Sequence, residues 1–411
     1  MLYLRWALIF TLAVVLAWGR MAEKSGVGLP AVAVQSEPAI LSAGMPASAP
    51  AALAAQRCLT RVGELRLLPQ GDRAQHHAAT LLALDDRQAL AFWFAGSREG
   101  AADVVVLRSQ FDGQHWLPAQ PVLAASTLSK LIHRDVRKLG NPVAWRDAEG
   151  RLHLAVVNVT LGGWAMSRLA HLRSDDLGLS FNAADDWVTS PWWNVSTLVR
   201  HPPQSLPDGT LLLPIYHEFA LKRPEVLHLS ASGQLLSRWR MAAGPQLLQP
   251  AIASAADPLH LIAVMRSGDS ARAQVHQQES TNGGQTWSAP QPIGLPNPDA
   301  SIAMVSWPQR RAWLMAYNPE QTTRKRLALA MRFWDDPEGE WRPVPGVELA
   351  EAVEASYPSL IVRGDRIDML YTRDRREIAH LQLQACPAPA EAAASAVAPA
   401  ASAGDEPSGR P

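Results

Sequence analysis

One eight-residue turn pattern constrains the fold of this chain more than any other feature. Its clearest copy runs from Ser280 to Trp287 and reads STNGGQTW. In such a turn the Asn side chain caps backbone N–H groups, the second Gly supplies a positive φ, and the closing Trp packs under the next strand. The pattern therefore predicts a β-hairpin of defined geometry.

Two further stretches follow the same pattern with substitutions. Residues 174–181 (SDDLGLSF) close with Phe in place of Trp. Residues 109–116 (SQFDGQHW) keep the Ser, Gly and Trp but have Phe at the acidic position. One polar turn with Gly would be weak evidence, because such turns are common. Three copies, each after a short apolar strand, indicate a repeat protein built of β-blades.

The rest of the body has the same character. Short apolar strands recur with turns between them and almost no helical periodicity. Many are apolar throughout, as expected where blades stack face to face and bury both sides of a strand. A body of about 330 residues with roughly 50–60 residues per blade indicates six blades, although counting alone leaves five or seven open. We therefore predict an all-β protein, a six-bladed β-propeller.

The N-terminal segment predicts the location of this body. Residues 6–18 (WALIFTLAVVLAW) form an apolar run behind Arg5. The run is shorter than the roughly 20 residues of a membrane span and fits the apolar part of a secretory signal. Because residues 17–19 make a poor cleavage site, residues 1–20 are predicted to be a signal peptide or a membrane anchor. Either predicts an exported body that is periplasmic, anchored at the inner membrane, or secreted.

Composition sets the limits of the folded body. Residues 21–56 are predicted to be an Ala/Pro-rich linker and residues 387–411 a disordered Ala/Pro-rich tail, because such segments bury too little apolar surface to fold. The propeller is then predicted over residues 57–386. Cys58 and Cys386 lie just inside its ends, and in an oxidising compartment a disulfide between them would lock the ring. The alternative is two unpaired buried thiols.

Charge and motif content exclude several classes of function. The formal net charge is zero, so there is no electrostatic case for nucleic acid or for an anionic membrane surface. No spacing of residues indicates a metal cage, a phosphate-binding loop or a Ser-His-Asp hydrolase elbow. We therefore expect no metal and no cofactor, and we expect a monomer whose N-terminal segment is its one route to a membrane.

Four short stretches, together with the three turns, carry a resemblance to a known family. They are residues 77–80 (HAAT), 94–100 (FAGSREG), 296–298 (PNP) and 357–360 (YPSL). Over nearly the whole body the chain resembles the sialidase (neuraminidase) superfamily with BNR/Asp-box repeats, specifically its bacterial predicted-neuraminidase branch. Such enzymes bind the carboxylate of a sugar with three arginines, attack with a Tyr paired to a Glu, and use an Asp as acid/base.

The resemblance implies roles for particular residues. Tyr357, in its Tyr-x-Ser-Leu context, matches the nucleophile; a Tyr suits this role because a carboxylate would be repelled by the acidic sugar. Arg266 and Arg324 match the second and third arginines of the carboxylate clamp, with Arg326 as the alternative to Arg324. The planar fork of Arg holds a carboxylate with two hydrogen bonds. The structural alternatives are a buried Tyr and exposed arginines at strand ends.

Two further matches lie in the first blade, and two departures from the family pattern accompany them. Arg98 matches an accessory arginine and Asp103 the acid/base, unless Asp103 is a solvated loop carboxylate. The first arginine of the clamp is absent and His77 stands in its place, a weaker and pH-dependent partner for a carboxylate. Gln249 stands where the Glu should be, and it is unable to accept the phenol proton. Glu218, which follows the apolar run 211–215, is the candidate to replace that Glu.

Taken together, the sequence predicts an exported exo-glycosidase that acts on a terminal acidic sugar, sialic acid or a related one. Its expected partner is an acidic glycan or polysaccharide. The missing arginine and the Gln leave two alternatives. The first is a non-catalytic propeller that binds acidic glycans, and the second is a lyase acting on a uronate polysaccharide.

Overall fold

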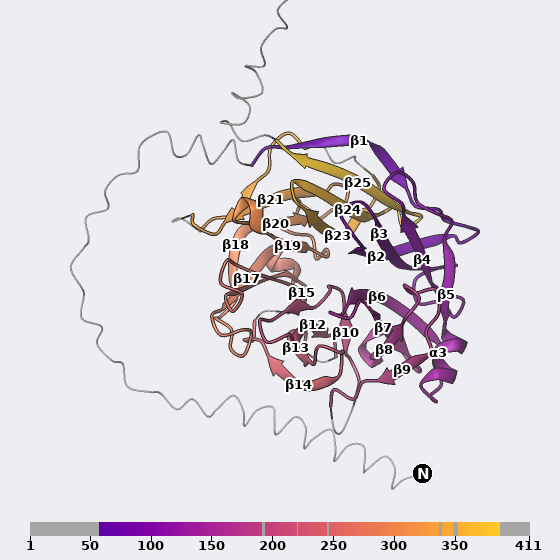
Figure 1. Ribbon diagram of the computed structural model, residues 1–411. Coiled ribbons are helices and arrows are strands. Elements are labelled where there is room, and N and C mark those ends of the chain that lie inside the picture. The colour runs from indigo at the N-terminus through magenta and orange to yellow at the C-terminus, as the bar shows by residue number, and fades with distance from the viewer. Residues whose placement is uncertain are drawn as a thin grey trace, which may run out of the picture. The chain divides into compact units, whose positions relative to one another are not determined.

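The computed structural model shows a six-bladed β-propeller (Figure 1). The described residues are 57–190, 194–219, 221–244, 246–336, 339–347 and 352–386. The predicted signal or anchor, the linker and the C-terminal tail lie outside them. The predicted all-β fold and its six blades are confirmed. Among the described residues, no helix combines the length and the apolar character needed to cross a membrane.

Each blade is an antiparallel sheet whose first strand lies nearest the central axis, and three of the blades come from the first half of the propeller. Blade 1 contains β2 (Gln75–Ala83), β3 (Ala89–Gly96), β4 (Val105–Phe111) and β5 (Gln120–Ala124). Blade 2 contains β6 (Lys138–Arg146), β7 (Leu152–Val159), β8 (Arg168–Ser174) and β9 (Ala183–Asp186). Blade 3 contains β10 (Leu198–Val199), β11 (Gln204–Ser205), β12 (Leu211–His217), β13 (Arg223–Leu229) and β14 (Leu235–Arg240).

The second half of the propeller repeats this arrangement. Blade 4 contains β15 (Leu247–Ser254), β16 (Leu261–Ser267), β17 (Gln274–Ser280) and β18 (Gln291–Pro296). Blade 5 contains β19 (Ala303–Trp307), β20 (Ala312–Tyr317), β21 (Ala328–Phe333) and β22 (Arg342–Pro343). Blade 6 contains β23 (Ala355–Arg363), β24 (Arg366–Arg373) and β25 (Glu377–Ala385). Short helices lie between strands: α3 (Ala125–Leu131), η1 (Trp164–Met166), η2 (Ser270–Arg272) and η3 (Pro308–Arg310).

The two ends of the propeller domain meet in blade 6 and close the ring. Strand β1 (Leu59–Leu67) pairs with β25 and becomes the outer strand of that blade. Beside this pairing, Cys58 and Cys386 form a disulfide with their Cα atoms 5.3 Å apart. The predicted disulfide is therefore present, and it joins positions 328 residues apart in the sequence.

The hydrophobic core consists of layers between neighbouring blades. Each of six clusters of buried apolar side chains consists mainly of residues from two adjacent blades. One layer, for example, contains Phe92 of blade 1 and Leu154 of blade 2, both fully buried. This packing explains why the strands are apolar on both faces.

The eight-residue turn pattern forms the hairpins that join the third and fourth strands of a blade. In the copy of blade 4, the Ser280 hydroxyl accepts from the N–H of Gly284 at 2.9 Å, and the Asn282 side chain accepts from the N–H of Thr286 at 3.0 Å. The Trp287 indole donates to the carbonyl of Gly284 at 2.9 Å. The side chains thus satisfy the backbone of their own turn, as the sequence predicts.

The irregular copy in blade 1 uses a different acidic residue. Asp112, one position later than the pattern expects, accepts from the N–H groups of Gln114 and His115 at 2.8 and 2.7 Å. The Trp116 indole donates to Nδ1 of His380 in blade 6 at 3.1 Å. This hairpin therefore closes its own turn and also joins the first blade to the last.

Irregular backbone near the start of the inner strands positions the site. A bulge interrupts β2, β6, β15 and β23 close to their first residues. In three of these bulges a residue other than glycine has a left-handed conformation: Ala78 (φ 56°), Gln249 (φ 54°) and Tyr357 (φ 54°). Left-handed backbone at such residues costs energy and is concentrated at functional sites.

We expect alanine at the turn glycine of blade 4 to be more destabilising than alanine at a glycine of equal φ in open space. Gly284 has φ +83°, and a Cβ there would lie 2.5 Å from Cδ1 of Leu212, which is buried in blade 3. Gly209 also has φ +83°, with no atom within 4 Å of its Cβ position. Gly209→Ala should cost the left-handed strain of about 1–2 kcal/mol, and Gly284→Ala should cost roughly 1–3 kcal/mol more from overpacking.

Chemical denaturation of both variants measures the difference in their free energies of unfolding. Equal losses in the two variants would contradict a role for the inter-blade contact of Gly284.

Candidate active site

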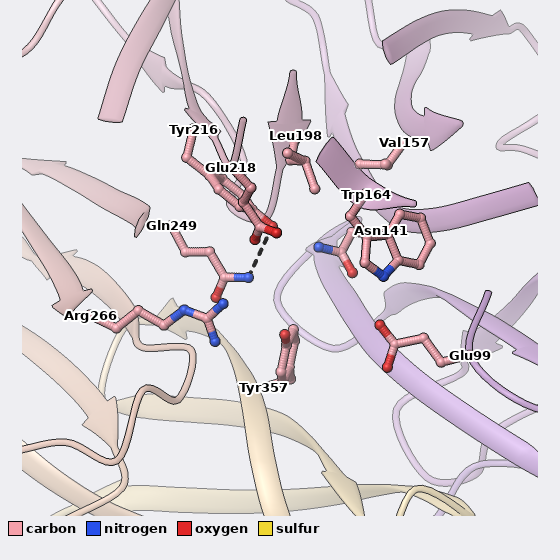
Figure 2. A pocket seen from close by; sticks show the side chains of 10 residues that line it. All are labelled: Glu99, Asn141, Val157, Trp164, Leu198, Tyr216, Glu218, Gln249, Arg266 and Tyr357. Carbon is pink, nitrogen blue, oxygen red and sulfur yellow. Dashed lines mark hydrogen bonds between the residues drawn. The ribbon is translucent and has the colours of Figure 1, made fainter. Parts of the chain in front are cut away.

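A cavity opens at the end of the propeller where the inner strands begin (Figure 2). It contains about 330 Å³ of free space, including the part open to solvent. Polar and charged side chains from five blades line it: Glu99, Asn141, Tyr216, Glu218, Gln249, Arg266 and Tyr357. The cavity therefore combines phenols, carboxylates and a guanidinium, which suits a polar, charged ligand better than an apolar one.

Tyr357 projects into this cavity from the bulge of β23 (Figure 2). Its ring lies against the ring of His77, with centroids 4.2 Å apart. On another side, Cζ of Arg200 lies 5.2 Å from the Tyr357 ring centroid. The bulge thus directs the phenol toward the cavity, while an imidazole and a guanidinium pack against its ring.

Tyr216 and Gln249 form a hydrogen-bonded pair on the wall of the cavity. Nε2 of Gln249 donates to the Tyr216 hydroxyl oxygen at 3.1 Å. Burial raises the pKa of Tyr216, so this phenol stays protonated at neutral pH. Because its oxygen already accepts from Gln249, its own O–H proton is left to donate to a ligand.

Arg266 and Arg324 come together through Asp299, which lies in the loop between β18 of blade 4 and β19 of blade 5. Both donate to the backbone carbonyl of Asp299, from Nη1 of Arg266 at 2.8 Å and from Nη2 of Arg324 at 2.6 Å. Nε of Arg266 also lies 3.2 Å from Oδ1 of the Asp299 carboxylate. Two arginines separated by 58 positions in the sequence thus have adjacent guanidinium groups, and of these two Arg266 lines the cavity whereas Arg324 does not.

A third arginine, which the sequence analysis missed, continues this arrangement. Nε of Arg375 donates to Glu354 at 2.8 Å, and its Nη1 donates to Glu99. The other oxygen of Glu354 lies 3.8 Å from Nη1 of Arg324. The charges therefore alternate in the order Arg266, Asp299, Arg324, Glu354, Arg375 and Glu99, which we call the charged belt. Its two end members, Arg266 and Glu99, line the cavity, and the other four do not.

Arg375 occupies an unusual place, the second central position of the hairpin turn between β24 and β25. An arginine in a short turn between two strands is the sequence signal that could have identified it. Asp374 and Arg375 both have φ 54°, and the N–H of Arg376 donates to the carbonyl of Arg373 at 3.0 Å. This is a two-residue turn that ordinarily requires Gly, Asn or Asp. An arginine in such a position is unusual, and its two ion pairs hold it there.

The loop after β3 contains Arg98 and Asp103, the two first-blade residues that the resemblance matched, and holds them away from the cavity. Arg98 is exposed in this loop. The Asp103 carboxylate accepts from the hydroxyl and the N–H of Ser97 at 2.9 and 2.8 Å, and these bonds lower its pKa. Neither residue lines the cavity, whereas Glu99 of the same loop does.

His77 lies behind Tyr357 and is only 2% exposed. Burial, reinforced by the positive charges of nearby arginines, holds the pKa of this imidazole well below its usual range. The ring is therefore neutral near pH 7. His77 packs under the phenol, and it is not among the residues that line the cavity.

Glu218 reaches the cavity from the end of β12, where it follows directly on a fully buried strand. Its N–H donates to the hydroxyl of Ser196 at 2.7 Å, which fixes the backbone at this point. Burial raises the pKa of the Glu218 carboxyl, although Arg266 opposes the shift. A carboxyl that retains its proton above the usual range is suited to general acid catalysis.

The remaining wall is apolar and was also missed in the sequence analysis. Val157, Trp164 and Leu198 form it. A Cβ at Gly140 would lie 2.9 Å from the Trp164 ring, so glycine is needed there for the indole to take its place. In the part of the chain that the structure describes, no group of three or more His, Cys, Asp or Glu side chains is arranged to hold a metal ion.

Comparisons with known proteins define the class to which this propeller belongs. The family model described as a BNR repeat-like domain matches residues 87–369. The chain therefore belongs to the BNR repeat-like family, and the predicted relationship to the sialidase superfamily is confirmed. Among curated proteins, no sequence matches this chain.

Solved structures with the same fold are distant in sequence. The Hadza microbial sialidase Hz136 has a TM-score of 0.62 and 14% identity over 75% of this chain, which covers 65% of that one. A protein of unknown function from Dyadobacter fermentans has a TM-score of 0.64 and 13% identity, over 80% of this chain and 99% of its own. The NanB sialidase of Streptococcus pneumoniae has a TM-score of 0.60 and 11% identity, over 78% and 70%. At these identities the likeness establishes the fold alone.

We expect Glu218→Gln to change stability in a pH-dependent way. Because burial raises the folded-state pKa of Glu218, its contribution to stability is fully present below the ordinary carboxyl pKa and is lost as pH rises through the folded pKa. The neutral amide avoids this loss. The melting temperature of Glu218→Gln should therefore rise relative to that of the unchanged protein as the pH increases above about 4, the ordinary pKa of a carboxyl group.

The control is Glu64→Gln, which replaces an exposed carboxylate on β1. The melting temperature of each protein is measured across the pH range. If the melting temperatures of Glu218→Gln and the unchanged protein change with pH in the same way, the environment of Glu218 does not disfavour its charge.

Proposed function

We propose that this protein is an exo-glycosidase that removes a terminal acidic sugar, sialic acid or a related one, with retention of configuration. The observation that carries the proposal is the meeting of Tyr357, Glu218 and Arg266 in one cavity at the axis of a sialidase-like propeller. A phenol, a carboxyl with a raised pKa and a guanidinium supply a nucleophile, a proton donor and an anion-binding group.

The charged belt is assigned to recognition of the sugar carboxylate. Arg266 and Arg324 present adjacent guanidinium groups, and Arg375 takes the place of the arginine that is missing at His77. Arginine forks bind carboxylates with paired, charge-assisted hydrogen bonds. A ligand carboxylate would replace some of the hydrogen bonds that these arginines make to Asp299 and Glu354. The belt therefore keeps the arginines in position and leaves them able to bind the ligand.

The proposed reaction assigns one step each to the phenol and the carboxyl. After its proton has left to solvent, the Tyr357 oxygen attacks the anomeric carbon, the bond to the leaving oxygen breaks, and that oxygen takes the proton of Glu218. Water then attacks the anomeric carbon, gives a proton to the Glu218 carboxylate, and releases the sugar and the Tyr357 oxygen. Glu218 has this role in preference to Asp103, because the Asp103 carboxylate is bonded to Ser97 outside the cavity.

One observation favours a second candidate, a propeller that binds an acidic glycan without turnover. Gln249 occupies the position where the resembling enzymes have a Glu, and its amide is bonded to Tyr216. An amide is unable to take the proton of the nucleophile. In that case the belt would hold the sugar and Tyr357 would only contact it.

We further propose that the protein acts outside the cytoplasm. The apolar run at residues 6–18 supports this location, because it has the character of a secretory signal. The disulfide between Cys58 and Cys386 also supports it, since such bonds persist in oxidising compartments.

We expect Tyr357→Phe to abolish hydrolysis while leaving ligand binding intact, because only the nucleophilic oxygen is removed. With the full-length protein and fluorogenic sialosides and uronides, kcat should fall about 1,000-fold or more. Tyr371→Phe is the matched control, since Tyr371 is a buried tyrosine of the same blade outside the cavity.

Each other outcome identifies a different function. Binding of acidic sugars without turnover by the unchanged protein would support the glycan-binding alternative. Unsaturated products that absorb in the ultraviolet would identify a lyase. Full turnover by Tyr357→Phe would overturn the proposed nucleophile.

We expect Arg375→Ala to weaken binding of an acidic sugar, because it removes one arginine and takes from Glu99 its ion pair with Arg375. Calorimetric titration with N-acetylneuraminate should show an affinity about 10- to 100-fold lower, the usual worth of hydrogen bonds to charged groups. Arg376→Ala, which changes the exposed neighbouring arginine, is the control. Equal affinities for the two variants would remove Arg375 from the clamp.

A further inference from the structure

We propose that Arg200 is a positioning residue for Tyr357: its buried guanidinium holds the bulge that carries Tyr357 and keeps a positive charge against the ring, so that the phenol reacts as its anion. This inference rests on the proposed function, since it explains how the proposed nucleophile is activated.

Arg200 connects three blades at the axis. It follows β10 of blade 3 and is 2% exposed. Its Nη1 donates to the carbonyl of Ala79 in blade 1 at 3.2 Å. Its Nη2 donates to the carbonyls of Tyr357 and Pro358 in blade 6 at 2.8 and 2.9 Å. These carbonyls belong to the bulges of β2 and β23, so Arg200 fixes the backbone that presents the Tyr357 ring.

The charge of Arg200 has no carboxylate partner within the described part of the chain. Among the described residues, no acidic side chain forms an ion pair with it, and its Nε is buried without a hydrogen bond. Burial lowers the pKa of Arg200 to about 10, so it remains charged at neutral pH. The groups that favour its charge are the phenols of Tyr357 and Tyr216.

An unpaired buried cation is costly, because no counter-charge repays its lost hydration. That cost is relieved when Tyr357 loses its proton, since the phenolate then lies against the guanidinium, whose Cζ is 5.2 Å from the ring centroid. A nearby opposite charge favours the ionised form of a titrating group. Arg200 therefore favours loss of the Tyr357 proton by attracting the phenolate. Gln249 has no carboxylate and is unable to accept that proton. The proton itself leaves through the open cavity to solvent.

Other titratable or charged groups surround the phenol and act together with Arg200. They include His77, Glu99, Tyr216, Glu218 and Arg266. Glu354 and Arg324 lie at the start of β23, where they contact Ser356 and Ala355, and their charged groups are 3.8 Å apart. His77 is neutral for the reason given above. Arg266 also favours the anion, but it is bonded to Asp299, whose carboxylate partly offsets its charge. Arg200 is thus the cation beside Tyr357 that has no acidic partner among the described residues.

The alternative is a purely structural role, in which the three carbonyl bonds hold the bulge and the charge is incidental. Three variants separate the two roles. Arg200→Lys keeps the charge and loses the fork, Arg200→Gln keeps N–H donors and loses the charge, and Arg200→Met loses both. Arg108→Met is the matched control, because Arg108 is 6% exposed and donates to the carbonyl of Leu177 in the next blade at 2.8 Å, away from the cavity.

The test is a spectrophotometric titration of the full-length protein, in which the absorbance of phenolate is followed against pH. The difference between each protein and its Tyr357→Phe counterpart isolates the signal of Tyr357. In Arg200→Gln and Arg200→Met this signal should move to higher pH by about one unit or more, and Arg200→Lys should keep it within a few tenths of its place. Arg108→Met should leave it unchanged.

The titration measures the phenol directly and does not depend on turnover. An unmoved Tyr357 signal in Arg200→Gln, with the protein still folded, would overturn the inference even if Tyr357 proves essential for hydrolysis. If Arg200→Met fails to fold, Arg200→Gln and Arg200→Lys still give opposite predictions. A shifted signal in a protein that hydrolyses no glycoside would leave the coupling standing and overturn the proposed function alone. With an active protein, kcat of Arg200→Gln should fall about 100-fold while KM changes little.

Discussion

Ring closure is the constraint on which the rest of this structure depends. Every blade buries both faces against its neighbours, so an open array would expose two apolar sheets. The pairing of β1 with β25 removes that possibility by building blade 6 from both ends of the domain, and the Cys58–Cys386 disulfide holds the pairing. Once the ring is closed, the inner strands converge on one axis, and residues far apart in the sequence become neighbours there.

The geometry of the axis explains why strained backbone and buried charge occur together. Inner strands that converge leave little room, and bulges at Ala78, Gln249 and Tyr357 turn the chain so that selected side chains face the cavity. The carbonyls of Ala79, Tyr357 and Pro358, which belong to the bulges of β2 and β23, also require hydrogen-bond donors. Arg200 donates to these three carbonyls with one side chain, and it brings to the centre of the site a cation that has no acidic partner among the described residues.

The candidate site could be predicted in part, and the failures have a common cause. Tyr357, Arg266, Gln249 and Glu218 meet in the cavity because each lies at the end of a strand, where the resemblance could be aligned. Asp103 lies in a loop whose path depends on its own turn bonds, so its place relative to the axis was not visible in the sequence.

The sequence alone could predict those features of this protein that depend on interactions between residues close together in the chain. Side-chain caps within each eight-residue turn and apolar strands between them specify β-blades, because both effects act over a few residues. Only the tertiary structure decided which charges meet. Arg375 pairs with Glu99 across 276 positions, and Arg200 reaches Tyr357 across 157. Such contacts arise from the closure of the ring, and no spacing along the chain encodes them.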